Sequence, residues 1–304
     1  MALDTRSFVG RYFSLTVDGQ DAGLIRGVEG GGIKGDLIAQ QVGGQPHRIK
    51  HINNPIIEPF SVQLGMSMSQ GFYDWIAASW AGDCQRRNGA VIVYDSDFKP
   101  RFEYSFTEAL ILETTIPTLD ASSRDPGFMT VKFQAESAEN KFNPGGSRMG
   151  SRAPGKQTQW LPSNFRLEID GLDVQRVSKI DSITVKQNVK PMSCGPDWMY
   201  QIEPTSLEVP NLTVYCAMAS AQPFYDWHKA FVVDGQNGPE NEKNGAITLL
   251  NPELNKELFT IDLKRIGILN IVAEKSDTAG EAQIKRAKIE MYVEEMAFSF
   301  VGGA

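Results

Sequence analysis

The residues of this sequence that could carry chemistry are few and far apart. The glycine-rich run at residues 27–35 has the composition of a phosphate-binding loop. It lacks the Gly-x-x-x-x-Gly-Lys-Ser/Thr order, however, and no helical pattern follows it. We therefore expect a flexible loop at this place and no nucleotide site.

The three histidines are the next candidates, because imidazole serves both as a metal ligand and as a general base. His47 and His51 are four positions apart, which would place them on one face of a helix. Pro46 and Pro55 surround this pair and argue against a helix. His228 has no counterpart in the repeat described below. We expect no metal site from these residues.

Two further patterns have simpler explanations than chemistry. Asp95 and Asp97 open a segment similar to a calcium loop, but Phe98 and Pro100 interrupt the pattern, so a hairpin turn is expected. No Gly-x-Ser-x-Gly element is present. The cysteines form no Cys-x-x-Cys pair; they are Cys84, Cys194 and Cys216. The sequence predicts no enzyme, no cofactor and no metal.

Composition narrows the classes of partner. The chain has 304 residues and a formal net charge of −7, which disfavours a static nucleic-acid coat and permits a surface past which nucleic acid slides. The first residues contain no apolar segment of signal-peptide length. Apolar runs are far shorter than the ~20 residues of a membrane helix. We expect synthesis in the cytoplasm and no membrane association.

An aromatic tetrapeptide, Phe-Tyr-Asp-Trp, occurs at residues 72–75 and again at residues 224–227, an offset of 152 positions. Other segments match in the same order, with the offset growing from 152 to 158. The matching pairs are 13–19 with 165–171, 60–64 with 212–216, 88–90 with 244–246, 102–106 with 259–263, and 130–136 with 288–294. Colinear matches of this kind indicate a duplicated unit.

The period is too long for a solenoid repeat, so each copy should be a domain. We expect a first domain at residues 1–136 and a second domain at residues 164–304. Residues 137–163 between them are rich in Gly, Pro, Ser and basic residues and predict a linker or an extended arm.

Within one copy, alternating apolar residues predict strands near residues 13–17, 60–64 and 129–135, and a hairpin at 90–106. Residues 71–80 predict a helix that packs on the sheet. The expected fold is α+β, mostly antiparallel: in each copy an open sheet or half-barrel with one packed helix and a long hairpin. The residues predicted to pack the helices are Phe72, Tyr73, Trp75, Phe224, Tyr225 and Trp227.

This order of segments resembles the phage tail tube family of contractile tails and related injection systems. In the first copy the resemblance depends on residues 13–19, the Phe-Tyr-Asp-Trp helix, the run Arg-Arg-Asn-Gly-Ala-Val-Ile-Val-Tyr-Asp at 86–95, and residues 101–109 and 130–136. The second copy follows less closely, since Glu242-Lys243-Asn244 replaces Arg-Arg-Asn. The resemblance covers most of residues 11–136 and 164–300.

The resemblance implies a structural protein that polymerises into stacked rings around a hollow tube for DNA or protein cargo. Family rings contain six one-domain subunits, so three of these two-domain chains would form a pseudo-hexameric ring. Sheath, tape-measure and baseplate proteins are implied partners, in a virion tail or injection-system particle. The candidate inter-subunit hairpin residues are Val91, Val93, Phe102, Tyr104, Phe106, Phe259, Ile261 and Leu263.

Other functions remain open at this point. A low-copy tube initiator, tube terminator or baseplate component would have the same fold. A soluble two-domain β binding module would stay monomeric and bind a glycan or peptide. An enzyme is the last choice, because the two copies share no paired catalytic residues.

Overall fold

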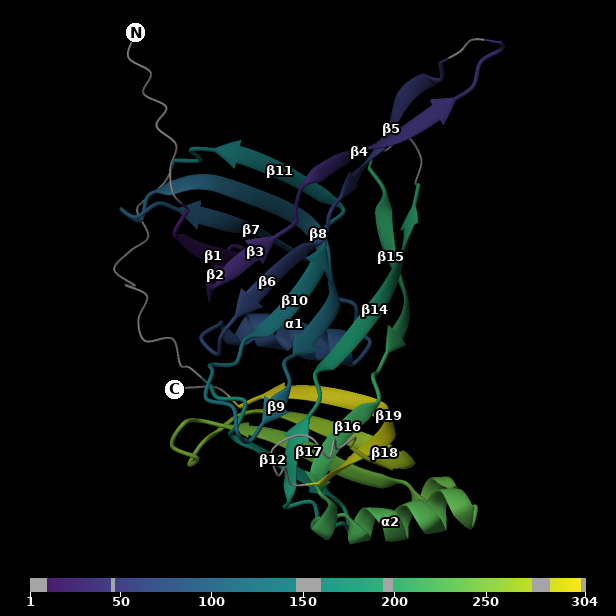
Figure 1. The fold of residues 1–304 in the computed structure, drawn as a ribbon. Coiled ribbons are helices and arrows are strands. Elements are labelled where there is room, and N and C mark those ends of the chain that lie inside the picture. Colours follow the sequence, from purple (N-terminus) through teal and green to yellow (C-terminus); the bar gives the residue numbers. More distant parts are fainter. Residues whose placement is uncertain (1–9, 45–46, 146–159, 194–198, 275–284, 302–304) are drawn as a thin grey trace, which may run out of the picture.

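The protein is described by a computed structural model that covers residues 10–44, 47–145, 160–193, 199–274 and 285–301. Two antiparallel sheets lie one above the other, with helix α1 (Gln70–Trp80) between them (Figure 1). A hairpin projects away from both sheets. The expected α+β, mostly antiparallel fold is confirmed.

The upper sheet is built mainly from the first copy, and its main path has the strand order β2-β1-β7-β8-β10-β6-β3. Alternating apolar residues account for these strands, because one face of each strand is buried against the helix and the core. The bounds are β1 Tyr12–Val17, β2 Gln20–Ile25, β3 Gly27–Glu29, β6 Phe60–Leu64, β7 Arg87–Tyr94, β8 Pro100–Ile116 and β10 Met129–Gln134.

The lower sheet is built mainly from the second copy and has the order β12-β17-β18-β19-β16-β13-β9. Its first six strands repeat the order β1-β7-β8-β10-β6-β3 of the upper sheet, so the two copies have the same topology. The bounds are β9 Leu119–Asp120, β12 Phe165–Ile169, β13 Val177–Ile180, β16 Leu212–Ala217, β17 Lys243–Leu250, β18 Glu257–Ala273 and β19 Arg286–Phe300.

The copies share a β-bulge at the same place in the β7–β8 and β17–β18 hairpins. Glu108 and Arg265 have φ values of 53° and 54°, in the left-handed region that side chains other than glycine rarely adopt. The side-chain oxygen of Asn88 accepts a hydrogen bond from the backbone N–H of Glu108, and Asn244 does the same for Arg265. The matching Asn-Gly pairs therefore have a structural cause.

The glycine of each Asn-Gly pair is needed because two backbones meet there. A Cβ atom on Gly89 would lie 2.1 Å from the carbonyl oxygen of Thr16, and one on Gly245 would lie 2.4 Å from that of Glu168. No side chain fits at such a distance. Both glycines allow the first strand of a copy to approach the hairpin closely.

The second copy has a shorter helix at the repeated tetrapeptide. Helix α2 spans Gln222–His228 and continues into a π-helical turn, η2 (Lys229–Val233). Two 3₁₀ turns, η1 (Met218–Ser220) and η3 (Pro239–Asn241), complete the helical segments. None of the helices in the described residues is both long and apolar enough to cross a membrane.

Each copy also contains a hairpin that sequence patterns did not indicate. The first is β4 (Ile33–Gln40) with β5 (Ile49–Ile57), and the second is β14 (Ile183–Met192) with β15 (Gln201–Glu208). Their registers are the same at an offset of 152, including one bulge: Lys34 pairs with Ile56 as Lys186 pairs with Glu208, and Gln40 with Ile49 as Met192 with Gln201. The hairpins are therefore equivalent.

The glycine-rich run was expected to be a flexible loop, and this expectation is wrong. Residues 27–29 form β3, which pairs with β6, and residues from Ile33 onward form β4. Gly30 and Gly31 between them have positive φ values, and a Cβ on either would clash with Pro59 or Phe60. The glycines serve a close crossing of strands.

Part of the expected linker is also ordered. Residues Ser137–Phe142 form strand β11, which pairs with β8 from Ser137 opposite Thr107 to Phe142 opposite Phe102. This strand is polar because it lies at the edge of the sheet (Figure 1). In the second copy the single long strand β19 takes the places of both β10 and β11.

Candidate assembly surfaces

The two copies are joined by a shared sheet. Strand β14 of the second copy pairs with the end of β8 in the first copy, with residues 183–186 opposite residues 116–113. The hydroxyl oxygens of Thr115 and Thr184 lie 3.1 Å apart across this pair. Hairpin β14–β15 thereby extends the upper sheet (Figure 1). The edge of one copy is completed by a hairpin of the other.

An arginine fixes the hairpin to the first copy. The guanidinium of Arg86 donates to a carboxylate oxygen of Glu136 at 2.8 Å and to the backbone carbonyl of Ile202, on β15, at 2.7 Å. The same oxygen of Glu136 accepts from the backbone N–H of Ile202 at 2.9 Å. Glu203 lies 3.5 Å from the guanidinium as a second acidic partner. These are charge-assisted bonds, the stronger class of hydrogen bond.

We call the contact between the two copies the joint. Aromatic side chains form its second part. The ring of Tyr73, on α1, stacks on that of Phe300, on β19, with centroids 3.8 Å apart. Phe298 of β19 contacts both Tyr73 and Trp80, at centroid distances of 6.3 Å and 5.7 Å. Helix α1 of the first copy therefore packs against the last strand of the second copy as well as against its own sheet.

The side chains predicted to pack the helices are placed differently in the two copies. Phe72, Tyr73 and Trp75 are fully buried on α1. In the second copy Phe224 and Trp227 are buried, whereas Tyr225 is exposed. The indole N–H of Trp75 donates to the carbonyl of Gln85 at 2.8 Å.

The residues predicted to lie in inter-subunit hairpins belong to the hydrophobic core or pack against it, except Val93 and Phe102. Most are buried, while Phe102 and Tyr104 are half-buried. Within β7–β8, Val91 pairs with Tyr104 and Val93 with Phe102. The three residues on β18 pair with β17 residues of their own hairpin. Their role between subunits stays a prediction. The exposed apolar side chains lie mainly on another hairpin, β4–β5.

The hairpins that make this surface were missed in the sequence. Hairpin β4–β5 exposes a set of apolar side chains; these are Ile33, Leu37, Ile38, Ile49, Ile52 and Ile56. At its base Asn53 donates to the hydroxyl of Tyr200 at 3.3 Å, so the two hairpins contact each other. The repeat offset is 152 both before and after each hairpin, so the two copies have segments of equal length there. This equal length was the signal in the sequence for two equivalent hairpins.

A cavity of about 280 Å³ lies where the hairpins meet strand β10. It is lined mainly by apolar side chains, among them Ile57, Val189 and Ile202. No group of three or more His, Cys, Asp or Glu side chains that could hold a metal ion occurs in the part of the chain that the structure describes.

A comparison with protein families gives a match for the first copy. Residues 9–139 match the family model described as the T4-like virus tail tube protein gp19. The first copy is thus similar to this family of structural tail tube proteins, as the sequence pattern indicated. The match ends before the second copy, which is connected to the first by its repeated topology.

Solved structures of low identity were also found. A tube–sheath complex of the PVC extracellular contractile injection system is 17% identical over 46% of this chain and 95% of that chain, with a TM-score of 0.40. The tube-terminating cap of the anti-feeding prophage is 15% identical over 47% and 99%, with a TM-score of 0.38. Hcp1 from Flavobacterium johnsoniae is 21% identical over 44% and 100%, with a TM-score of 0.28. A search of curated proteins gave no match.

Proposed function

We propose that this chain is a structural subunit of a tail tube and that three chains form one pseudo-hexameric ring. The single observation that supports this most strongly is the joint between the copies, in which β14 completes the edge of β8. The joint is head-to-tail: one copy supplies a hairpin and the other supplies an edge. Such a heterologous contact leaves one hairpin and one edge unused, and its repetition closes into a ring or continues as a helix.

Rings would stack into a hollow tube that carries DNA or protein cargo. Sheath, tape-measure and baseplate proteins would be its partners within a virion tail or injection particle, assembled from chains made in the host cytoplasm. The solved structures named above come from such assemblies, including a tube–sheath complex and a tube cap. A tandem domain halves the number of contacts between separate chains that a six-position ring needs.

Native mass spectrometry of purified chains, followed by negative-stain microscopy, tests this proposal. We expect a species of three times the 33.6 kDa chain mass and ring-shaped particles that stack. A chain that stays monomeric at high concentration, with or without a sheath or baseplate fraction to nucleate it, contradicts the proposal. The number of copies in whole particles separates a tube from an initiator or terminator, which would contribute a single ring.

A further inference from the structure

The edge that β14 fills on β8 has an unfilled counterpart on β18. Residues 113–116 of β8 correspond to residues 270–273 of β18, because both segments follow an equivalent bulge and face equivalent positions on β10 and β19. Val272, the counterpart of Thr115, is 42% exposed. In the described part of the chain, no strand pairs with this side of β18. The edge is a vacant acceptor.

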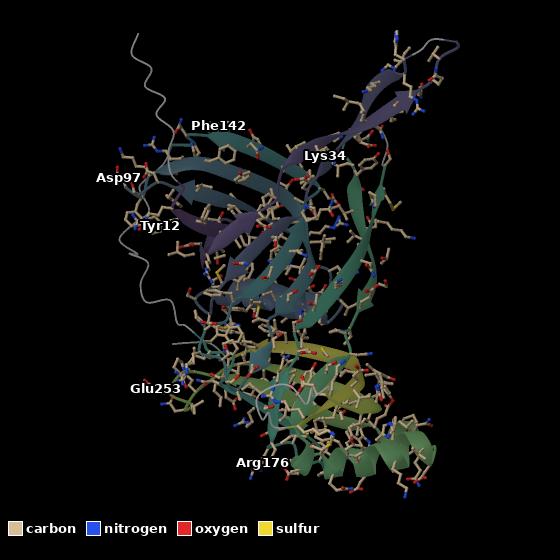
Figure 2. All side chains as sticks on the ribbon, in the orientation of Figure 1. Tyr12, Lys34, Asp97, Phe142, Arg176 and Glu253 are labelled. Carbon is tan, nitrogen blue, oxygen red and sulfur yellow. The ribbon has the colours of Figure 1, made fainter. Side chains whose placement is uncertain are left out.

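The matching donor is the hairpin of the first copy. Residues 31–34 correspond to residues 183–186, the part of β14 that pairs with β8. Ile33 is 44% exposed, whereas its counterpart Val185 is buried in the joint. Hairpin β4–β5 points away from both sheets, and Lys34 marks its base (Figure 2). Its strands and its exposed apolar side chains suit it to pair with the free edge of a sheet. In the described part of its own chain, β4 and β5 pair only with each other.

The aromatic part of the joint has free counterparts as well. The repeated tetrapeptide makes Tyr225 the counterpart of Tyr73. The strand registers make Phe142 the counterpart of Phe300. Tyr225 is 37% exposed and Phe142 is 75% exposed, although their counterparts stack on each other. Phe142 lies at the upper end of the molecule and α2 at the lower end, so the two cannot meet within one chain (Figure 2).

The charges at the joint are reversed between the copies. Arg86 of the first copy faces Glu203 of the second hairpin. The corresponding residues are Glu242 in the second copy and His51 on hairpin β4–β5, next to Lys50. Placing hairpin β14–β15 on the second copy would bring Glu203 to Glu242, and like charges disfavour such a contact.

We propose that hairpin β4–β5 and strand β11 of one chain dock on the β18 edge and helix α2 of a second copy of this chain. The contact repeats the joint within the chain, with Phe142 stacked on Tyr225 and His51 beside Glu242. This inference rests on the proposed ring, and it defines the surface by which the ring closes. Because each chain contains both copies, joints within and between chains alternate around the ring.

Cross-linking of mixed single-cysteine chains tests the contact. The background replaces the native cysteines by alanine; these are Cys84, Cys194 and Cys216. Chains with Phe142→Cys are mixed with chains carrying Tyr225→Cys and treated with a short bifunctional maleimide. We expect a cross-linked pair in the mixture and none from either chain alone. Phe142→Cys mixed with Glu253→Cys, in a turn of the lower copy (Figure 2), should give background yield only.

Two outcomes of this experiment are distinct. Wild-type rings with no cross-link above the Glu253→Cys control would overturn the docking contact and leave the proposed ring standing. Wild-type chains that never assemble would contradict both, and the mass measurement identifies this case before the variants are made.

A charge exchange gives a second test that does not depend on cysteine. His51→Glu should lower the fraction of chains in rings at least tenfold, because it sets a second carboxylate beside Glu242. Glu242→Arg should also lower it, because it removes the carboxylate that faces His51 and Lys50. The double variant places a carboxylate on the hairpin and a guanidinium on the copy, as in the Arg86–Glu203 pair, and should restore ring formation to near the wild-type level. Single variants that assemble normally, or a double variant no better than the singles, would overturn the contact.

Discussion

Asn88 and Glu108 are linked by a hydrogen bond of 2.9 Å from the backbone N–H of Glu108 to the side-chain oxygen of Asn88. The bond stabilises a residue whose φ is 53°, at the bulge that bends β8. The same pair recurs as Asn244 and Arg265, at 3.1 Å. The bulges therefore have one chemical origin in both copies.

Asn88→Ala should lower the free energy of unfolding by about 1 kcal/mol, because it removes the hydrogen bond that holds a left-handed residue. Denaturant unfolding of the chain measures the change. Asn211→Ala is the matched control, since this exposed side chain makes no hydrogen bond with the described residues. Equal stability of the two variants would show that the bulge does not need the asparagine.

Gly89→Ala should lower the free energy of unfolding by about 2 kcal/mol or more, because the new Cβ would lie 2.1 Å from the carbonyl oxygen of Thr16. Gly71→Ala, on helix α1, meets no atom within 4 Å and should raise stability by about 0.5 to 1 kcal/mol. Thermal melting of both variants measures the difference. A Gly89→Ala chain as stable as the wild type would contradict the close approach of β1 and β7.

Arg86→Ala should loosen the joint, because it removes bonds to Glu136 and to the carbonyl of Ile202. The expected cost is about 2 kcal/mol, typical of hydrogen bonds to charged groups. Amide exchange at Ile202, whose N–H donates to Glu136, should accelerate before global unfolding. Arg166→Ala removes an exposed pair with Glu257 and should cost less than about 1 kcal/mol. Unchanged protection of Ile202 would show that Arg86 does not fix the hairpin.

Stability should fall at high pH through Tyr292. Burial, together with a hydrogen bond to the Glu242 carboxylate, raises the pKa of Tyr292 to about 12. An unfolded tyrosine loses its proton near pH 10. Between about pH 10 and pH 12, Tyr292 is therefore deprotonated in the unfolded chain and protonated in the folded chain. The free energy of unfolding therefore decreases as pH rises through this range and is unaffected by this group below it.

Tyr292→Phe should show a smaller decrease over the same range, measured by urea unfolding at a series of pH values. Tyr73, whose pKa is also raised by burial, still contributes in that variant. An unchanged pH slope would contradict the assignment to Tyr292.

The sequence predicted the parts of the fold whose patterns are local. The helix at residues 71–80 and the hairpin around Asp95 were found because apolar spacing and turn residues lie within a few positions of each other. The carboxylate of Asp95 accepts from the N–H groups of Asp97 and Lys99, which explains the turn that its sequence indicated.

Hairpin β4–β5 and strand β11 were missed for a physical reason. An exposed strand does not need an alternating pattern, because neither face is fully buried in the chain itself. The residues of β5, Ile-Lys-His-Ile-Asn-Asn-Pro-Ile-Ile, therefore show no clear period. The stack of Tyr73 on Phe300 could not be predicted from local sequence patterns either, because it joins residues from opposite halves of the chain.

The division into domains at residues 1–136 and 164–304 stays a prediction, with two features that bear on it. Strand β11 continues the first copy to Phe142. Residues 146–159 of the expected linker lie outside the described residues. Trp160, just after them, is buried and contacts Phe259, so the segment before β12 packs on the second copy.

Cryo-microscopy of the assembled chain tests the central claim most directly, because it shows how many chains form a ring and which edges they use. We predict three chains per ring, with hairpin β4–β5 of each chain paired to residues 270–273 of the next and Phe142 against Tyr225. A ring of six chains, or an assembly in which β4–β5 touches no neighbouring β18, would contradict the account.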